Sequence, residues 1–422
     1  MTQTSLARLC GIAVASLAFT IAFSVAAQLD SESANVAAPD DWAASVEQLL
    51  SAIETEESRN APPTEALGRE RLALGRLYEQ QDEYDLAAAQ FDRALEIIRA
   101  RTGFNALEQA PIFREMIPNA ENRGDFELVH ELEERLVALA AANADDPRAV
   151  GLYEEIADRQ VAAFLRFQQQ GTPFNVNVNE RVRATYKVNP LFDERSAALA
   201  ELERARENYA EAAALIRGGL DGGSELEALE TKLVRTYYVE ATLRNAMPPE
   251  AAYRSGEKIY RRMLAEKEAG SESAQSLAST LVALADWHLL FEHPRPAFER
   301  YRQAYDLLAA EPDAAELLSR LFVPEVPVRL PVFGANPLPA QPSDTGTEYL
   351  EVVVEVSEQG HAEATEVSAG GRDVPRDIEN EIEREFVRGR FRPLFVDGDI
   401  AKNGRFHLRY PIDAARLSAG EG

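Results

Sequence analysis

The sequence predicts a mainly α protein, in which an irregular solenoid of helix pairs is followed by a small α+β domain. Apolar residues recur three and four positions apart from about residue 41 to residue 321. After residue 348 apolar residues alternate with polar ones, as is typical of strands. These two periodicities give a predicted helical repeat domain at residues 28–321 and a C-terminal domain at 348–413, with a tail at 414–422.

Six prolines fall between Pro324 and Pro342, where the two periodicities meet. Proline lacks a backbone N–H and favours extended chain, so residues 322–347 are predicted to form a proline-rich linker with little internal hydrogen bonding. At ~3.1 Å per residue the stretch from Pro324 to Pro342 would reach roughly 60 Å at most. We therefore expect two separately folded domains joined by a tether.

The first residues of the chain have the pattern of an export signal. Arg8 precedes an apolar run, and the small residues 25–27 offer a cleavage site before Gln28. The run approaches the ~20 residues needed to cross a bilayer, so residues 1–27 are predicted to be a signal peptide or a retained membrane anchor. Cys10 is the only cysteine, so the cleaved protein would have no disulfide and no thiolate metal ligand.

Two stretches of the helical region share one spacing of small and aromatic residues. They are Leu74, Gly75, Tyr78, Ala87, Phe91 and Ala94, and later Leu284, Ala285, Ala297, Tyr301 and Ala304. Both resemble the tetratricopeptide repeat, in which small residues let paired helices approach closely. We expect Gly75 to face Ala87 and Ala285 to face Ala297. Such stacks present a concave face to partners, and the alternative is that this region only spaces or stabilises the C-terminal domain.

Residues 171–192 interrupt the helical pattern with alternating residues and a basic cluster of Arg181, Arg183 and Lys187. Long irregular excursions in compact domains are often functional. This segment is predicted either to bind a partner or to pack over the edge of the solenoid.

The C-terminal domain has a predicted order of strand, strand, helix and strand. Strands are expected at residues 350–356 and 362–367, followed by a helix that Asp373 caps. The apolar stripe of this helix is Val374, Ile378, Ile382 and Phe386. In the last strand, Phe406, Leu408 and Tyr410 are expected on one face, and Arg405, His407 and Arg409 on the other.

Short motifs occur in and before this domain in a characteristic order. They are Asn336-Pro337-Leu338-Pro339, the strand and turn at 352–360, Arg390-Phe391-Arg392-Pro393 and Asp397-Gly398. Together they resemble the C-terminal domain of the TonB family, the periplasmic module that engages outer-membrane transporters in Gram-negative bacteria. Leu338 stands where that family usually has Tyr. The resemblance implies that the final strand pairs with a short peptide of a partner protein.

Basic residues gather on and after the predicted C-terminal helix, within an otherwise acidic chain. A local basic surface favours docking of an acidic or extended peptide. With the implied strand pairing, this gives the candidate partner-binding residues Arg390, Arg392, Arg405, Phe406, His407, Leu408, Arg409 and Tyr410.

Charge and residue inventory argue against several classes of function. The formal net charge of −27 argues against generic binding to nucleic acid or anionic membranes. The sequence has no nucleophile elbow and no glycine-rich phosphate loop, and the spacing of His288 and His293 does not place them on one helix face. We therefore expect no catalytic residue, no cofactor and no metal.

The predicted function is an exported adaptor in the periplasm of a Gram-negative bacterium, which binds envelope proteins such as outer-membrane transporters by strand addition. The alternative is a membrane-anchored energy transducer of the TonB type for transport across the outer membrane. Membrane contact is expected only if residues 9–27 are retained. That segment has no histidine, whereas the anchors of the family's transducers generally carry one.

Overall fold

The computed structural model describes residues 42–59, 62–171, 194–220, 223–243, 246–324, 326–333, 349–368, 376–396 and 398–411. It divides into two compact units, Met1–Glu201 and Leu202–Gly422. The predicted signal or anchor at residues 1–27 and nearly all of the segment at 171–192 lie outside the described residues. No helix in the described ranges is both long and apolar enough to cross a bilayer.

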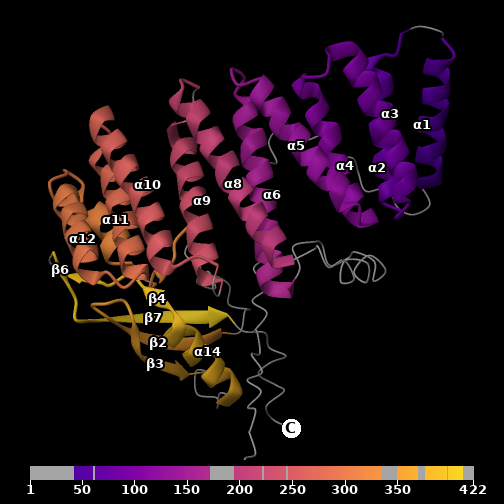
Figure 1. The fold of residues 1–422 in the computed structure, drawn as a ribbon. Helices are drawn as coiled ribbons and strands as arrows, with labels where there is room; N and C mark the ends of the chain where they lie inside the picture. The colour runs from indigo at the N-terminus through magenta and orange to yellow at the C-terminus, as the bar shows by residue number, and fades with distance from the viewer. Residues whose placement is uncertain are drawn as a thin grey trace, which may run out of the picture. The chain divides into compact units, whose positions relative to one another are not determined.

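The first unit is a stack of antiparallel helices in which each helix packs against its neighbour in sequence (Figure 1). The helices are α1 (Trp42–Glu57), α2 (Glu65–Glu79), α3 (Tyr84–Thr102), the short η1 (Leu107–Gln109), α4 (Ala110–Arg123), α5 (Phe126–Ala142) and α6 (Arg148–Gln170). Thr64 caps α2 through the N–H of Leu67, and Asp125 caps α5 through the N–H of Leu128. Gly124 ends α4 with a φ of 72°, a left-handed conformation that glycine adopts without strain.

The first repeat-like stretch forms the contact between α2 and α3. Leu74, Ala87, Phe91 and Ala94 are fully buried. The ring of Phe91 is the group nearest to Gly75, because a Cβ on Gly75 would lie 2.4 Å from that ring. The small residue is therefore needed, but the group that fills the space beside it is the aromatic ring.

The second unit also begins with a series of helices. Its helices are α8 (Glu194–Arg217), in which the division between the units falls, α9 (Gly223–Thr242), α10 (Pro249–Gly270), α11 (Ala274–Leu290), α12 (Pro294–Ala309) and α13 (Ala314–Phe322). Ala285, Ala297, Tyr301 and Ala304 are buried in one cluster between α11 and α12. Gly256 of α10 lies against Trp287 of α11, whose indole N–H donates to the carbonyl of Tyr253 at 2.9 Å.

The end of the chain forms a small antiparallel sheet with one covering helix. The elements are β2 (Tyr349–Ser357), β3 (Ala362–Ser368), α14 (Arg376–Arg388), β4 (Arg390–Phe391), β5 (Phe395–Val396), β6 (Asp399–Ile400) and β7 (Asn403–Pro411). The strand order is β3-β2-β7. Ile378, Ile382 and Phe386 of α14 pack on the apolar face of β2. The prediction of a mainly α chain with a small α+β end is confirmed, while Asp373 and Val374 lie outside the described residues.

The first part of the predicted linker is packed structure and not a free tether. Residues 329–330 form β1 (Arg329–Leu330), which pairs antiparallel with β4. Leu330 and Phe322 are buried in the same cluster as Tyr301 of α12 and Phe395 of β5. The helices and the sheet thus share a core, and Figure 1 shows the sheet at one end of α10, α11 and α12. Residues 334–348 lie outside the described part of the chain.

Candidate functional site

Within the described part of the chain, strand β7 pairs with β2 alone, and its other side is a sheet edge there. The register places Val354 opposite Phe406 and Val352 opposite Leu408. On β2, the N–H of Ser357 donates towards β3, to His361, while the N–H of Glu358 donates to Lys402, which precedes β7. Backbone groups alternate in direction along a strand. The N–H and C=O groups of Val354 and Val352 therefore point towards β7.

The same alternation assigns the backbone groups of β7. Phe406 and Leu408 bond to β2, so the N–H and C=O groups of Arg405, His407 and Arg409 point away from the sheet. The one irregularity, between Glu355 and Val356, adds its extra residue to β3 and leaves β2 and β7 in register. The edge therefore offers the outward donor and acceptor pairs of Arg405 and His407 to an incoming strand.

The side chains of β7 alternate as the sequence predicts. Phe406 and Leu408 are buried against α14, whereas Arg405, His407 and Arg409 are exposed on the other face. Arg405 lies 3.6 Å from Glu366 of β3 and 4.0 Å from Glu355 of β2. The guanidinium of Arg409 lies over the ring of Tyr349 at 4.7 Å. The exposed face therefore carries a row of basic residues along its edge strand.

Tyr410 lies where the strand meets the helix. Its hydroxyl donates to Oε2 of Glu385 at 2.7 Å. Burial raises the pKa of Tyr410, and the bond to Glu385 raises it further, so the phenol stays protonated at neutral pH. This candidate residue joins α14 to β7 inside the domain.

Arg392 does not lie on the predicted docking surface. Its Nε donates to Asp286 of α11 at 3.0 Å and its Nη2 to the same carboxylate at 2.5 Å, while the hydroxyl of Tyr301 donates to Asp286 at 2.6 Å. Both charged side chains are nearly enclosed, with 11% and 7% exposed. Burial lowers the pKa of Arg392, but the charge and hydrogen bonds of Asp286, together with Tyr301, outweigh burial and raise the pKa. The residue ties the sheet to the helices instead of meeting a partner.

Arg390 also makes contacts within the chain. Its Nη1 donates to the carbonyl of Gln359 at 2.8 Å and meets Nε2 of His361 at 2.6 Å, and its Nη2 pairs with Glu292. Only 11% of its side chain is exposed. Of the candidate residues, Arg405, His407 and Arg409 are the ones whose side chains lie on the surface.

His288 is a buried residue with a hydrogen-bond partner. Its Nδ1 lies 3.0 Å from the hydroxyl of Tyr253, and the ring of Tyr253 also contacts that of His293. Burial lowers the pKa of His288 to about 4, so the imidazole is neutral at neutral pH. Both histidines pack against Tyr253 of α10, His288 from α11 and His293 from the turn before α12.

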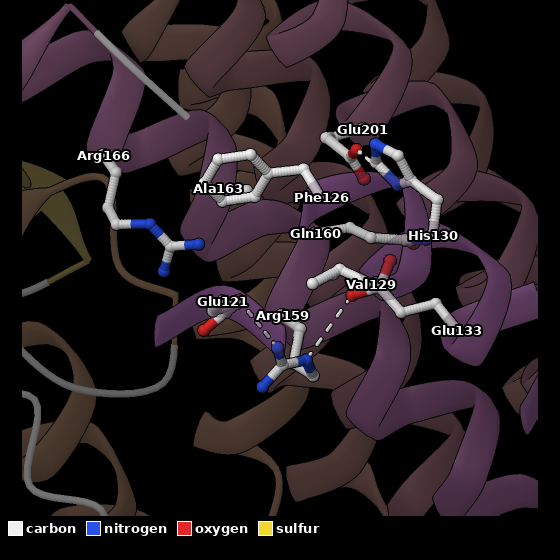
Figure 2. Close-up of a pocket in the computed structure, with 10 residues that line it drawn as sticks. All are labelled: Glu121, Phe126, Val129, His130, Glu133, Arg159, Gln160, Ala163, Arg166 and Glu201. Carbon is white, nitrogen blue, oxygen red and sulfur yellow. Dashed lines mark hydrogen bonds and ion pairs between the residues drawn. The ribbon is translucent and has the colours of Figure 1, made fainter. Parts of the chain in front are cut away.

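The structure also brings together three residues that the sequence analysis did not connect. His130 and Glu133 lie one turn apart on α5, and Glu201 comes from α8. Their ligand atoms lie within 4.8 Å of one another, and Nδ1 of His130 is 3.5 Å from Oε1 of Glu201. Figure 2 shows the imidazole beside the carboxylate of Glu201. The His-x-x-Glu spacing on α5 was visible in the sequence, but nothing marked Glu201 as its neighbour.

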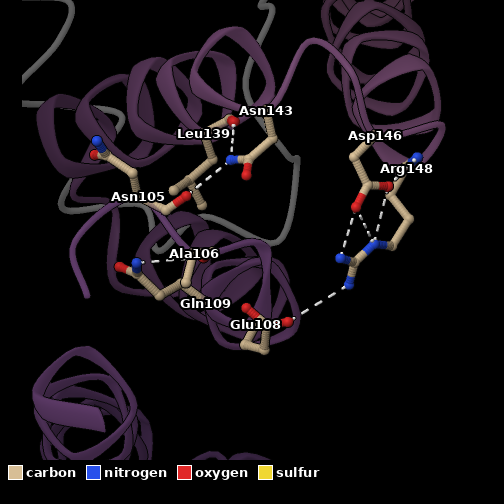
Figure 3. A network of polar contacts seen from close by, with 8 residues as sticks. All are labelled: Asn105, Ala106, Glu108, Gln109, Leu139, Asn143, Asp146 and Arg148. Carbon is tan, nitrogen blue, oxygen red and sulfur yellow. Dashed lines mark hydrogen bonds and ion pairs between the residues drawn. The ribbon is translucent and has the colours of Figure 1, made fainter. Parts of the chain in front are cut away.

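A second polar cluster joins the loop after α3 to the loop between α5 and α6 (Figure 3). Nδ2 of Asn143 donates to the carbonyls of Asn105 and Leu139, each at 2.8 Å. Arg148 bonds Asp146 at 2.7 Å and lies 3.7 Å from Glu108. These polar groups are paired with one another, so the cluster holds the two loops together.

Comparison with known proteins gives matches to structures alone. No protein-family model and no curated protein matches the chain. A kinesin-light-chain-type protein of Podosopora anserina, built from nearly identical TPR-like repeats, is 15% identical over 58% of this chain and 97% of its own, with a TM-score of 0.34. BtubC (BKLC) from P. vanneervenii is 15% identical over 72% of this chain and 94% of its own, with a TM-score of 0.33.

Proposed function

We propose that this chain is a protein-interaction adaptor that captures an extended segment of a partner along the outer edge of β7. The observation that supports this proposal is the outward direction of the backbone groups of Arg405 and His407 on an edge strand. An incoming strand would satisfy these groups, so the main chain supplies affinity and alternate side chains supply selectivity.

The side chains of the edge define the class of segment. A strand added beside β7 would place every second side chain next to Arg405, His407 and Arg409, which are exposed. Opposite charges across a strand pair are favourable and like charges are unfavourable. The preferred segment therefore alternates acidic and apolar residues, and the stacked helices are a further surface for the same or another partner.

The location we propose is the periplasm, with envelope proteins as partners. The support is the export pattern of residues 1–27 together with the resemblance of the C-terminal motifs to the TonB family. Strand addition to the final strand is the mode that this resemblance implies. An adaptor reading requires no membrane anchor, so it is compatible with removal of residues 1–27.

Replacing His407 with proline is expected to weaken binding of an alternating Glu-Val hexapeptide by ~3–10-fold, because one inter-chain hydrogen bond contributes about 0.5–1.5 kcal/mol. The N–H of His407 points away from β2, so the change leaves the pairing with β2 in place. Fluorescence anisotropy with a labelled peptide measures the dissociation constant.

The matched control is His407→Ala, which removes the same side chain and keeps the N–H. This variant should bind the peptide almost as well as the wild type. An alternating Lys-Val hexapeptide should bind more weakly than the Glu-Val peptide to all three proteins. Equal binding by the proline and alanine variants would contradict strand addition at β7.

Cleavage of the export signal is expected to give a mature chain that begins at Gln28, because small residues precede that position. Mass spectrometry of the protein recovered from a Gram-negative host measures the N-terminus. Ala27→Leu, which places a large residue at the cleavage site, should leave the longer chain. A wild-type protein that keeps Met1 in the envelope would favour the anchored transducer over the adaptor.

A further inference from the structure

The cluster of His130, Glu133 and Glu201 has the residue types and the separations of a metal-ligand set. Imidazole nitrogen and carboxylate oxygen are ligands of zinc and related divalent metals, and no sulfur is needed. His130 and Glu133 stand on one face of α5 because they are three residues apart. Glu201 supplies the third atom from α8, and all three atoms lie within 4.8 Å of one another.

The shortest separation between ligand atoms in the cluster matches the distance between two ligand atoms bound to one zinc ion. In a tetrahedral zinc site with bonds of about 2.1 Å, two ligand atoms lie about 3.4 Å apart. Nδ1 of His130 and Oε1 of Glu201 are 3.5 Å apart. The remaining atoms need to approach by about an ångström, which rotation of the Glu133 side chain supplies within ordinary rotamer changes.

The surroundings of the cluster suit a small ion better than an organic ligand. The cavity beside it has a volume of about 30 Å³, and a water needs about 10–15 Å³ of such space. Three protein ligands leave the fourth position of a tetrahedral zinc open, and the cavity has room for a water there. Glu133 and Glu201 are buried, while 37% of the His130 side chain is exposed, which gives an entry path.

Charged neighbours also meet the cluster. Arg159 donates to Glu121 at 2.8 Å and to Oε1 of Glu133 at 3.5 Å, and Arg166 lines the same cavity. Burial lowers the pKa of Arg166, while Glu121 raises it. The cavity thus holds three carboxylates against two guanidinium groups, and Arg159 orients Glu133 as an outer-shell partner does.

We propose that His130, Glu133 and Glu201 form a binding site for one zinc-type divalent cation, with a water as fourth ligand. The site would fix α5 to the beginning of α8 within the first unit. It is independent of the edge of β7, so the two proposals stand or fall separately. We assign the site a structural role because it joins residues of α5 and α8.

The test uses the full chain, stripped with a chelator and titrated with zinc chloride by isothermal calorimetry. The wild type should bind roughly one zinc per chain, and its melting temperature should rise with zinc concentration. His130→Asn should weaken binding at least ~10-fold, because it removes the only nitrogen ligand. The half-exposed position of His130 lets this variant keep its fold, which circular dichroism in chelator checks.

Two further variants distinguish zinc binding at this cluster from zinc binding elsewhere on the protein. His407→Asn removes an exposed histidine far along the sequence and should bind zinc as the wild type does. Glu201→Gln also changes contacts without metal, so its readout is the zinc-induced rise in melting temperature, which should be lost. Equal zinc binding by the wild type and His130→Asn, or no zinc-induced stabilisation of the wild type, would show that the cluster is only an ion pair and overturn the proposal.

Discussion

Replacing Arg392 with methionine is expected to lower the free energy of unfolding of the second unit by about 3–5 kcal/mol, because the change leaves a buried carboxylate without its cation. Asp286 would keep the hydrogen bond from the hydroxyl of Tyr301 but lose its ion pair. Trp287, which neighbours Asp286 and is buried, reports this transition by fluorescence in a Trp42→Phe background.

A second substitution, at Asp286, tests whether the unpaired carboxylate causes the loss of stability. Adding Asp286→Asn to Arg392→Met removes the unpaired charge and keeps an acceptor for Tyr301, so part of the lost stability should return. The exposed pair of Arg302 and Asp399 is the control, since Arg302→Met should cost only about 0–1 kcal/mol. A loss at Arg392 as small as the loss at Arg302 would contradict a buried, stability-determining bridge.

Replacing Gly256 with alanine is expected to destabilise the second unit by about 1–3 kcal/mol through overpacking. The new Cβ would lie 2.2 Å from Cζ2 of Trp287, and the bond from the indole to the carbonyl of Tyr253 opposes movement of that ring. The measurement is again the melting transition reported by Trp287, whose emission should also shift if the ring is displaced.

Gly151 provides a control for Gly256 because it lies inside an α-helix with open space around its Cα. No heavy atom outside its own helix lies within 4 Å of an added Cβ, so Gly151→Ala should stabilise α6 by up to about 1 kcal/mol. If both alanine variants raised the melting temperature, the close packing of Gly256 on Trp287 would be contradicted.

The sequence predicted the elements whose pattern is local. The alternation from Leu350 to Val356 and the stripe of Ile378, Ile382 and Phe386 each report which side of one element meets the core. The same holds for Gly75, whose small size signalled a close helix contact although its neighbour is Phe91. Local periodicity identifies a buried face, but it does not identify the residue that meets it.

In the described part of the predicted linker, the expected extended backbone is present, but the expected solvent-exposed tether is not. Proline excludes helix and favours extended chain, and residues 329–330 are indeed extended. An extended segment can be a free tether or a docked strand, and the difference depends on whether a partner strand is within reach. Here β4, about sixty residues later, supplies that partner.

The candidate site residues also divide into those that a local pattern predicts and those that depend on contacts between distant parts of the sequence. The exposed edge residues of β7 could be predicted because alternation within one strand decides them. The sequence could not show that Arg392 is buried and not exposed, because its bond to Asp286 joins residues 106 positions apart. His130 and Glu201 escaped for the same reason, since a glutamate in so acidic a chain carries no mark of its spatial neighbours.

The shared core of the last helices and the sheet has a consequence for the helix stack itself. A stack of repeats needs a closing element, because its last helix pair has an apolar side with no further repeat to cover it. Leu330 and Phe395 cover Tyr301 and Phe322 at this position, so the sheet domain acts as the terminal cap of the stack. A fragment that stops at residue 321 would expose this apolar end and leave Asp286 without Arg392, and would self-associate rather than behave as an isolated binding domain.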